Sequence, residues 1–209
     1  MSGAGATPSA AELAELIARG PREHARRIWQ PMEGDRPASV LVPLIPSADG
    51  LRVVLTRRSP DLTKHAGEFS FPGGRPEPQD AGPRETALRE AHEEIGVAAD
   101  LVEIIGSLPP TTTYRTGYAI TPFVGIINAP PAWVAQVSEV AEVAEPLLTE
   151  LVAVRYIHTY QRPEGGERLD MPVFPIDEER QVWGATARIL DELLVRLAPV
   201  IPGAALAYG

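Results

Sequence analysis

Apolar positions along the chain repeat at two spacings, which divide the sequence into helices and strands. Helical spacing predicts helices over residues 10–19, 83–96 and 182–199. Pro83 is typical of a first helical position and Gly96 of a C-terminal cap, so the middle helix has a signal at each end. These helices lie far apart in the sequence, and the segments between them carry a different pattern.

Strand-like apolar runs fill most of those segments. Runs at 39–45 and 51–56 flank a short turn and predict a hairpin. We also expect a short helix at 21–29, a loop at 31–38, strands at 101–107, 117–128 and 151–157, an acidic segment at 138–151, and a hairpin loop at 161–170. The alternation of helices and strands predicts a mixed-sheet α/β or α+β domain.

Composition and charge exclude several classes of protein. The 209 residues are 44% apolar, contain no cysteine and carry a net charge of −9. Disulfides, thiolate metal sites and cysteine nucleophiles are therefore excluded, and the acidic balance argues against nucleic-acid binding. No apolar run is long enough to span a membrane, and the N-terminus does not resemble a secretory signal. We expect a cytoplasmic protein with one domain at 31–200, an N-terminal tail and helical segment at 1–30, and a C-terminal tail at 201–209.

The helix at 83–96 carries three glutamates on one flank. At about 100° per residue, Glu90, Glu93 and Glu94 lie side by side, beginning at the edge of an apolar stripe that includes Ala87 and Ala91. Glu90 and Glu94 are a like-charge pair one turn apart, and a divalent cation with a preference for oxygen ligands would relieve their repulsion. A solvated acidic face is the alternative.

A glycine-rich loop precedes this helix within an irregular stretch at 57–82, and long irregular loops are uncommon unless they are functional. Gly74, Asp80 and the run at 89–97 together resemble the Nudix box, Gly-x5-Glu-x7-Arg-Glu-U-x-Glu-Glu-x-Gly-U, where U is apolar. Two departures stand out: Asp80 replaces the first glutamate, and one extra residue separates it from Arg89. The resemblance implies an α/β/α sandwich with a mixed β-sheet, and hydrolysis of nucleoside diphosphates linked to another group.

The upstream segment narrows the resemblance. The runs at 55–59, 65–68 and 69–74 are similar to the signature of the coenzyme A pyrophosphatase branch, with Thr63 where an arginine is usual. Weaker similarity extends the resemblance over roughly 39–197. This branch implies metal-dependent cleavage of coenzyme A or its acyl derivatives into 3′,5′-ADP and (acyl-)4′-phosphopantetheine.

Two other functions stay open. A Nudix diphosphatase for ADP-ribose, NADH or dinucleoside polyphosphates is one, with Tyr114 as sequence support for the last of these substrates. A non-catalytic module that senses a nucleotide is the other, but it predicts loss of the box carboxylates, and all three glutamates are present. The expected partner is a small, coenzyme A-like nucleotide, with no nucleic acid and no membrane, and a homodimer is possible.

The family correspondence implies roles for individual residues. Glu90 and Glu94 would be the main ligands of Mg²⁺ or Mn²⁺, with Glu93 and the Gly74 carbonyl as further ligands. Arg89 would hold a glutamate in place. The general base would be Glu93 or an acid outside the box, with Glu139 or Glu142 as candidates, and Asp80 is a further acid near the cation. The substrate contacts would come from Arg57, Arg58, His65 and Gly73, for which solvent exposure or a structural role is the alternative.

Overall fold

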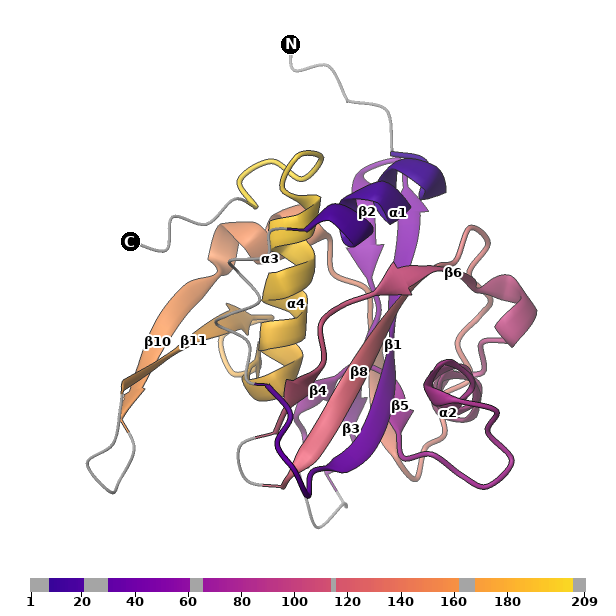
Figure 1. The fold of residues 1–209 in the computed structure, drawn as a ribbon. Helices are drawn as coiled ribbons and strands as arrows, with labels where there is room; N and C mark the ends of the chain where they lie inside the picture. The colour runs from indigo at the N-terminus through magenta and orange to yellow at the C-terminus, as the bar shows by residue number, and fades with distance from the viewer. Residues whose placement is uncertain (1–7, 21–29, 61–65, 114–115, 162–167, 205–209) are drawn as a thin grey trace.

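A mixed β-sheet forms the centre of the molecule (Figure 1). The computed structural model describes residues 8–20, 30–60, 66–113, 116–161 and 168–204. Within these residues the sheet has the order β2-β1-β8-β6, while β5 pairs with β1 and β7 pairs with β8. Its strands are β1 (Arg36–Ser47), β2 (Gly50–Val53), β5 (Gly73–Gly74), β6 (Glu103–Ser107), β7 (Thr111–Thr112) and β8 (Tyr118–Ile126).

The sheet is mixed because β1 and β8 run parallel while its other pairs are antiparallel. Most of β1 is apolar without alternation because both of its faces are covered. Leu41 and Ile45 belong to the core beneath one face, and Val42 and Leu44 to the core beneath the other. The central strand therefore separates two hydrophobic cores.

Two smaller sheets complete the strands of the described residues. In the first, β3 (Leu55–Arg58) lies between β4 (Phe69–Ser70) and β9 (Val140–Ala144). In the second, β11 (Arg168–Pro175) lies between β10 (Tyr156–Gln161) and β12 (Gln181–Val182). Strand β3 follows β2 closely in the chain, and a short run joins its partner β4 to the glycine strand β5.

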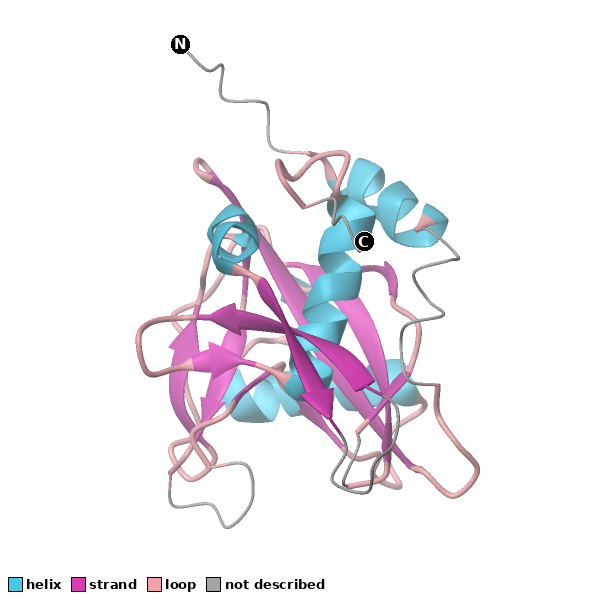
Figure 2. Cartoon of the chain, turned by 90° about the vertical axis from the view of Figure 1, so that its left-hand side faces the viewer, coloured by secondary structure: helices cyan, strands magenta, loops and turns pink. Residues whose placement is uncertain are grey.

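Helices cover both faces of the central sheet. The chain forms α1 (Ala10–Arg19), α2 (Pro83–Ile95), a 3₁₀ turn (Ala99–Leu101), α3 (Leu148–Val154) and α4 (Gly184–Leu197). In Figure 1, α2 lies on one side of the sheet and α4 on the other. Viewed from the side of the β10 and β11 hairpin, α4 runs between that hairpin and the central sheet (Figure 2). The expected α/β/α arrangement with a mixed sheet is confirmed.

Three local expectations differ from the structure. The loop expected at 31–38 ends early, because pairing with β8 extends β1 back to Arg36. The strand expected at 151–157 is wrong: its first part is helix α3, whose Leu148 and Leu151 are both buried, and β10 begins only at Tyr156. The expected loop at 57–82 contains β4 and β5. The helix expected at 21–29 lies outside the described residues.

No helix among the described residues has the length and apolar character needed to cross a membrane.

Candidate active site

The helix α2 turns its apolar face to the sheet and leaves its glutamates at the border of that face. Ala87, Ala91 and Ile95 are fully buried in the core that lies beneath β1. Pro83 stands in the first turn, and Gly96 ends the helix in the left-handed conformation with φ of 73°. These signals fix the register of α2 and therefore the direction in which its glutamates point.

Glu94 is a buried carboxylate with an unsatisfied oxygen. Its side chain accepts a hydrogen bond from the backbone N–H of Gly73, yet its Oε2 atom is buried without a hydrogen-bond partner among the described residues. The pKa of Glu94 is raised to about 8, mainly by burial and secondly by the charge of Glu90. A buried carboxylate oxygen without a partner destabilises the folded state unless a cation or another group binds it.

Glu90 lies directly against the glycine strand. A side chain at Gly74 would collide with the Glu90 carboxylate, and one at Gly73 would collide with the carbonyl oxygen of Ser39 on β1. Burial also raises the pKa of Glu90, although the neighbouring Arg89 opposes this. The two glycines are required because only a bare backbone can pass between β1 and the carboxylates.

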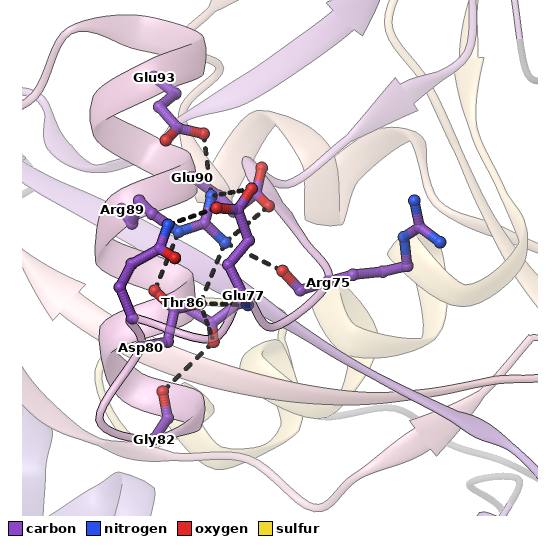
Figure 3. A network of polar contacts seen from close by, with 9 residues as sticks. Arg75, Glu77, Asp80, Gly82, Thr86, Arg89, Glu90 and Glu93 are labelled. Carbon is purple, nitrogen blue, oxygen red and sulfur yellow. Dashed lines mark hydrogen bonds and ion pairs between the residues drawn. The ribbon is translucent and has the colours of Figure 1, made fainter.

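Arg89 ties the acidic flank of α2 to the preceding loop (Figure 3). Its Nε and Nη2 atoms donate to the two carboxylate oxygens of Asp80 at 2.9 and 3.1 Å. Its Nη1 atom donates to Glu93 at 2.9 Å, and Nη2 also contacts Glu90 at 3.2 Å. The carbonyl of Arg75 accepts a further bond, while the Arg75 side chain points away from the cluster. Arg89 therefore orients two of the three glutamates.

Asp80 is the main partner of Arg89 in this network. Its side chain is 4% exposed and forms a bidentate pair with Arg89, which holds the pKa of Asp80 well below its usual range. Thr86, which is fully buried, donates a hydrogen bond to Asp80 at 2.9 Å. A tight turn at Glu77 brings this shorter acid to the arginine. A contribution of Asp80 to a cation stays a prediction, and in the structure both of its carboxylate oxygens are engaged by Arg89.

Removing the Thr86 hydroxyl is expected to weaken this support. Thr86→Val should lower the free energy of unfolding by about 1–2 kcal/mol, because a hydrogen bond to a charged group is lost in a buried place. Urea denaturation would measure the loss, and Thr86→Ser should retain most of the stability. Thr111→Val is the matched control, since the Thr111 hydroxyl is buried without a partner among the described residues. Equal effects of the two valine variants would contradict the role of Thr86.

Glu139 reaches the box carboxylates from another part of the chain. The N–H of Gln136 donates to the carbonyl of Glu94, and the N–H of Glu139 donates to the carbonyl of Gln136. The N–H of Ser59 in turn donates to the carbonyl of Glu139. The charge of Glu139 contributes to the raised pKa values of both Glu90 and Glu94.

Glu142 faces other partners. It accepts hydrogen bonds from Arg57 at 2.9 Å and from Arg180 at 2.5 Å. Arg58 instead acts on Glu94, whose pKa its positive charge lowers. The Nε atom of Arg58 is buried without a hydrogen-bond partner among the described residues. The charges of Arg58 and Glu139 therefore act on the box glutamates, whereas Arg57 is paired with Glu142.

Glu93 and His65 complete the residues expected from the sequence. The Glu93 side chain is 47% exposed and is held by Arg89. His65 lies outside the described residues. Thr86 and Gln136 were not expected. Thr86 stands three residues before Arg89, a spacing that sequence reasoning could have used, whereas Gln136 acts through its backbone and leaves no sequence signal.

The donor set fits a divalent cation that prefers oxygen. Within the described residues no group of three or more acidic or histidine side chains is arranged so that it could hold a metal ion. Mg²⁺ in proteins, however, commonly takes one or two carboxylates and keeps several waters. Glu90 and Glu94 supply two such carboxylates next to a bare glycine strand, and the Oε2 atom of Glu94 is buried without a hydrogen-bond partner among the described residues.

An α/β/α sandwich whose glutamate-bearing helix meets a glycine strand has the arrangement that the resemblance to the Nudix box implies for a hydrolase of nucleoside diphosphate derivatives. The chain belongs to the Nudix family, since the NUDIX domain profile matches residues 35–170. It is a Nudix hydrolase, an enzyme acting on a nucleotide with a diphosphate linkage, and Nudix hydrolases generally use Mg²⁺ or Mn²⁺.

Relatives support this assignment along most of the chain. The sequence is 37% identical over 171 residues to a protein from Pectobacterium atrosepticum named "Uncharacterized Nudix hydrolase NudL", with 81% of this chain and 86% of the relative covered. It is 40% identical over 166 residues to the protein of the same name from Escherichia coli, covering 78% and 83%. A MutT/nudix family protein from Enterococcus faecalis has a similar fold, with a TM-score of 0.53, 16% identity, and 94% and 78% covered.

Proposed function

We propose that the protein hydrolyses the diphosphate linkage of coenzyme A or its acyl derivatives. The products would be 3′,5′-ADP and (acyl-)4′-phosphopantetheine. The observation that supports this most is the position of the segment resembling the coenzyme A pyrophosphatase signature. Its glycines contact Glu90 and Glu94, and its Arg58 acts on Glu94. A segment that borders the reacting groups is well placed to select the substrate.

The cation would be held by residues of α2 and β5. We propose Glu90 and Glu94 as its main ligands, with the Gly74 carbonyl as a further one. Glu93 is a less favoured ligand because Arg89 already holds its half-exposed side chain. When bound, a divalent cation neutralises diphosphate oxygens and lowers the pKa of bound water.

Residues of the chain itself would supply the general base and the contacts to the substrate phosphates. Glu139 is the proposed general base: it would accept a proton from the water that attacks one phosphorus and forms a new P–O bond. The bond between that phosphorus and the bridging oxygen would break, and the bridging oxygen would leave with the other phosphate. Glu139 is preferred to Glu93 because its charge acts on both Glu90 and Glu94. Arg58 and the backbone of Gly73 would contact the substrate phosphates. Arg57 is a weaker candidate since Glu142 engages it, and His65 stays a proposed contact.

A panel of substrates tests the proposal. Purified protein would be incubated with coenzyme A, acetyl-coenzyme A, ADP-ribose, NADH and a diadenosine polyphosphate, each with Mg²⁺ and with Mn²⁺, and the products separated by chromatography. We expect 3′,5′-ADP and 4′-phosphopantetheine from coenzyme A as the fastest reaction. Intact coenzyme A alongside cleaved ADP-ribose would overturn the substrate and leave the class of enzyme standing.

Glu139→Gln is expected to lower kcat by about 10²-fold, because general-base catalysis is worth roughly this much. The glutamine keeps the size of the side chain and removes its ability to accept the proton. Glu93→Gln is the matched comparison on α2, and its loss should be at least several-fold smaller. Steady-state kinetics over a range of pH would measure both. A larger loss in Glu93→Gln would assign the base to Glu93.

A further inference from the structure

A hydrogen bond from the indole of Trp133 joins the two ends of the segment that contains Glu139. The Nε1–H of Trp133, at the start of the segment, donates a hydrogen bond to the carboxylate of Glu145, which follows strand β9. The ring of Trp133 also packs against the core between α2 and the central sheet. The carbonyl of Glu145 accepts a hydrogen bond from Arg52 on β2, so the acceptor is itself anchored to the sheet.

The segment after Trp133 is fastened to the C-terminal end of α2. The N–H of Val134 donates to the carbonyl of Ile95 at 3.1 Å, and the N–H of Gln136 donates to the carbonyl of Glu94 at 3.0 Å. These bonds use carbonyls that the last turn of a helix leaves without helical partners. A Cβ at Gly96 would come within 2.9 Å of the Cβ of Val134, so the contact is close.

The same segment sets the place of Glu139. Its N–H donates to the carbonyl of Gln136 at 2.8 Å, and its carbonyl accepts from Ser59 at 2.7 Å, one residue after Arg58. Before Glu139 the side chains of Val134 and Val137 are exposed, at 69% and 85%, whereas Val140 directly after it is buried where β9 pairs with β3. Residues 133–137 are therefore held by backbone bonds and by the anchor at Trp133, and Glu139 stands between them and β9.

We infer that Trp133 is a positioning residue of the active site: its bond to Glu145 holds residues 133–139 on the end of α2 and thereby places Glu139 beside Glu90 and Glu94. The inference rests on the role proposed for Glu139. The hydrogen bond of the Trp133 indole goes to Glu145, not to the glutamates of α2 or to the glycine strand. A displacement of about 1 Å in a catalytic group can cost 10²-fold in rate.

A double-mutant cycle tests the inference. Trp133→Phe keeps a ring in the core and removes the N–H, and we expect kcat to fall about 10-fold with KM within twofold of wild type. In the Glu139→Gln background, Trp133→Phe should change kcat by less than twofold, because the carboxylate that Trp133 positions is already absent. Equal losses in both backgrounds would overturn the inference, since a general structural effect does not depend on Glu139. Val137→Ala, an exposed change in the same segment, is the control and should leave kcat unchanged.

The acceptor provides a conservative rescue. Glu145→Gln retains an oxygen that accepts from the indole and should stay within about threefold of wild type, whereas Glu145→Ala should reproduce the loss in Trp133→Phe. Equal losses in the two Glu145 variants would contradict a role of this hydrogen bond. The assays use coenzyme A, or the member of the substrate panel that the wild-type enzyme cleaves.

Hydrogen exchange makes the test independent of activity. In Trp133→Phe the amide protons of Val134 and Gln136 should exchange at least about 10-fold faster than in the wild type, while that of Gly96, bonded to the carbonyl of His92, should not change. Unchanged exchange at Val134 and Gln136 would overturn the inference whatever the substrate is. Full activity of Glu139→Gln would overturn it as well, by removing the group that is positioned, and would leave the proposed hydrolysis standing.

Discussion

Glu94→Gln is expected to lower kcat by about 10³-fold with the fold retained. Groups that offset charge in the transition state have effects of this size when removed. Glutamine has the shape of glutamate and keeps an oxygen that can accept from the N–H of Gly73, but it carries no charge to attract a divalent cation. The variant should also fold well, since it removes a buried carboxylate whose Oε2 atom lacks a partner among the described residues.

Steady-state kinetics with Mn²⁺, together with circular dichroism, would measure this result. Glu85→Gln is the matched control, because it removes one negative charge from an exposed position on the same helix. It should retain the wild-type rate within about twofold. A Glu94→Gln enzyme that keeps more than about a tenth of wild-type activity would contradict the assignment of Glu94 as a main cation ligand.

The parts of the fold that were predicted correctly are those with local signals. Helix α1 begins after Ser9, whose side chain and Glu12 form a reciprocal capping box, and α2 has a proline and a glycine at its ends. The segment at 151–157, predicted as a strand, contains Val152 and Val154, and β-branched residues favour strands. Burial of Leu148 and Leu151 at helical spacing decides for helix, and that packing is set by distant elements.

The same division holds for the site. The grouping of Glu90 with Glu94 follows from helical periodicity alone. The approach of Glu139 does not, because it depends on backbone hydrogen bonds between residues more than forty positions apart, and such bonds have no residue signature. Arg57 and Arg58 show a further limit: adjacent arginines look equivalent in the sequence, yet one pairs with Glu142 and the other acts on Glu94.

The burial of Glu94 predicts that the metal-free protein loses stability as the pH rises. The pKa of this carboxyl is about 8 in the folded state against 4.5 for an ordinary glutamate. The folded state therefore binds the proton more tightly than the unfolded state, and the free energy of unfolding falls between pH 4.5 and 8. The loss from this group is on the order of 3 kcal/mol by pH 7, at about 1.4 kcal/mol per pH unit.

A divalent cation should reverse this loss, because it binds the ionised form of Glu94 in the folded state only. We expect Mn²⁺ to raise the melting temperature more at pH 8 than at pH 5.5, where the carboxyl is largely protonated and the cation must displace a proton. Glu94→Gln should flatten the pH dependence of the metal-free protein and remove most of the metal effect, while Glu85→Gln should change neither. The free energy of unfolding of both proteins would be measured in a chelator at pH 5.5 and at pH 8. The same rise with pH in the wild type and in Glu94→Gln would refute the prediction. The comparison removes one carboxyl together with its electrostatic coupling to Glu90, while the other titrating side chains are shared by the two proteins.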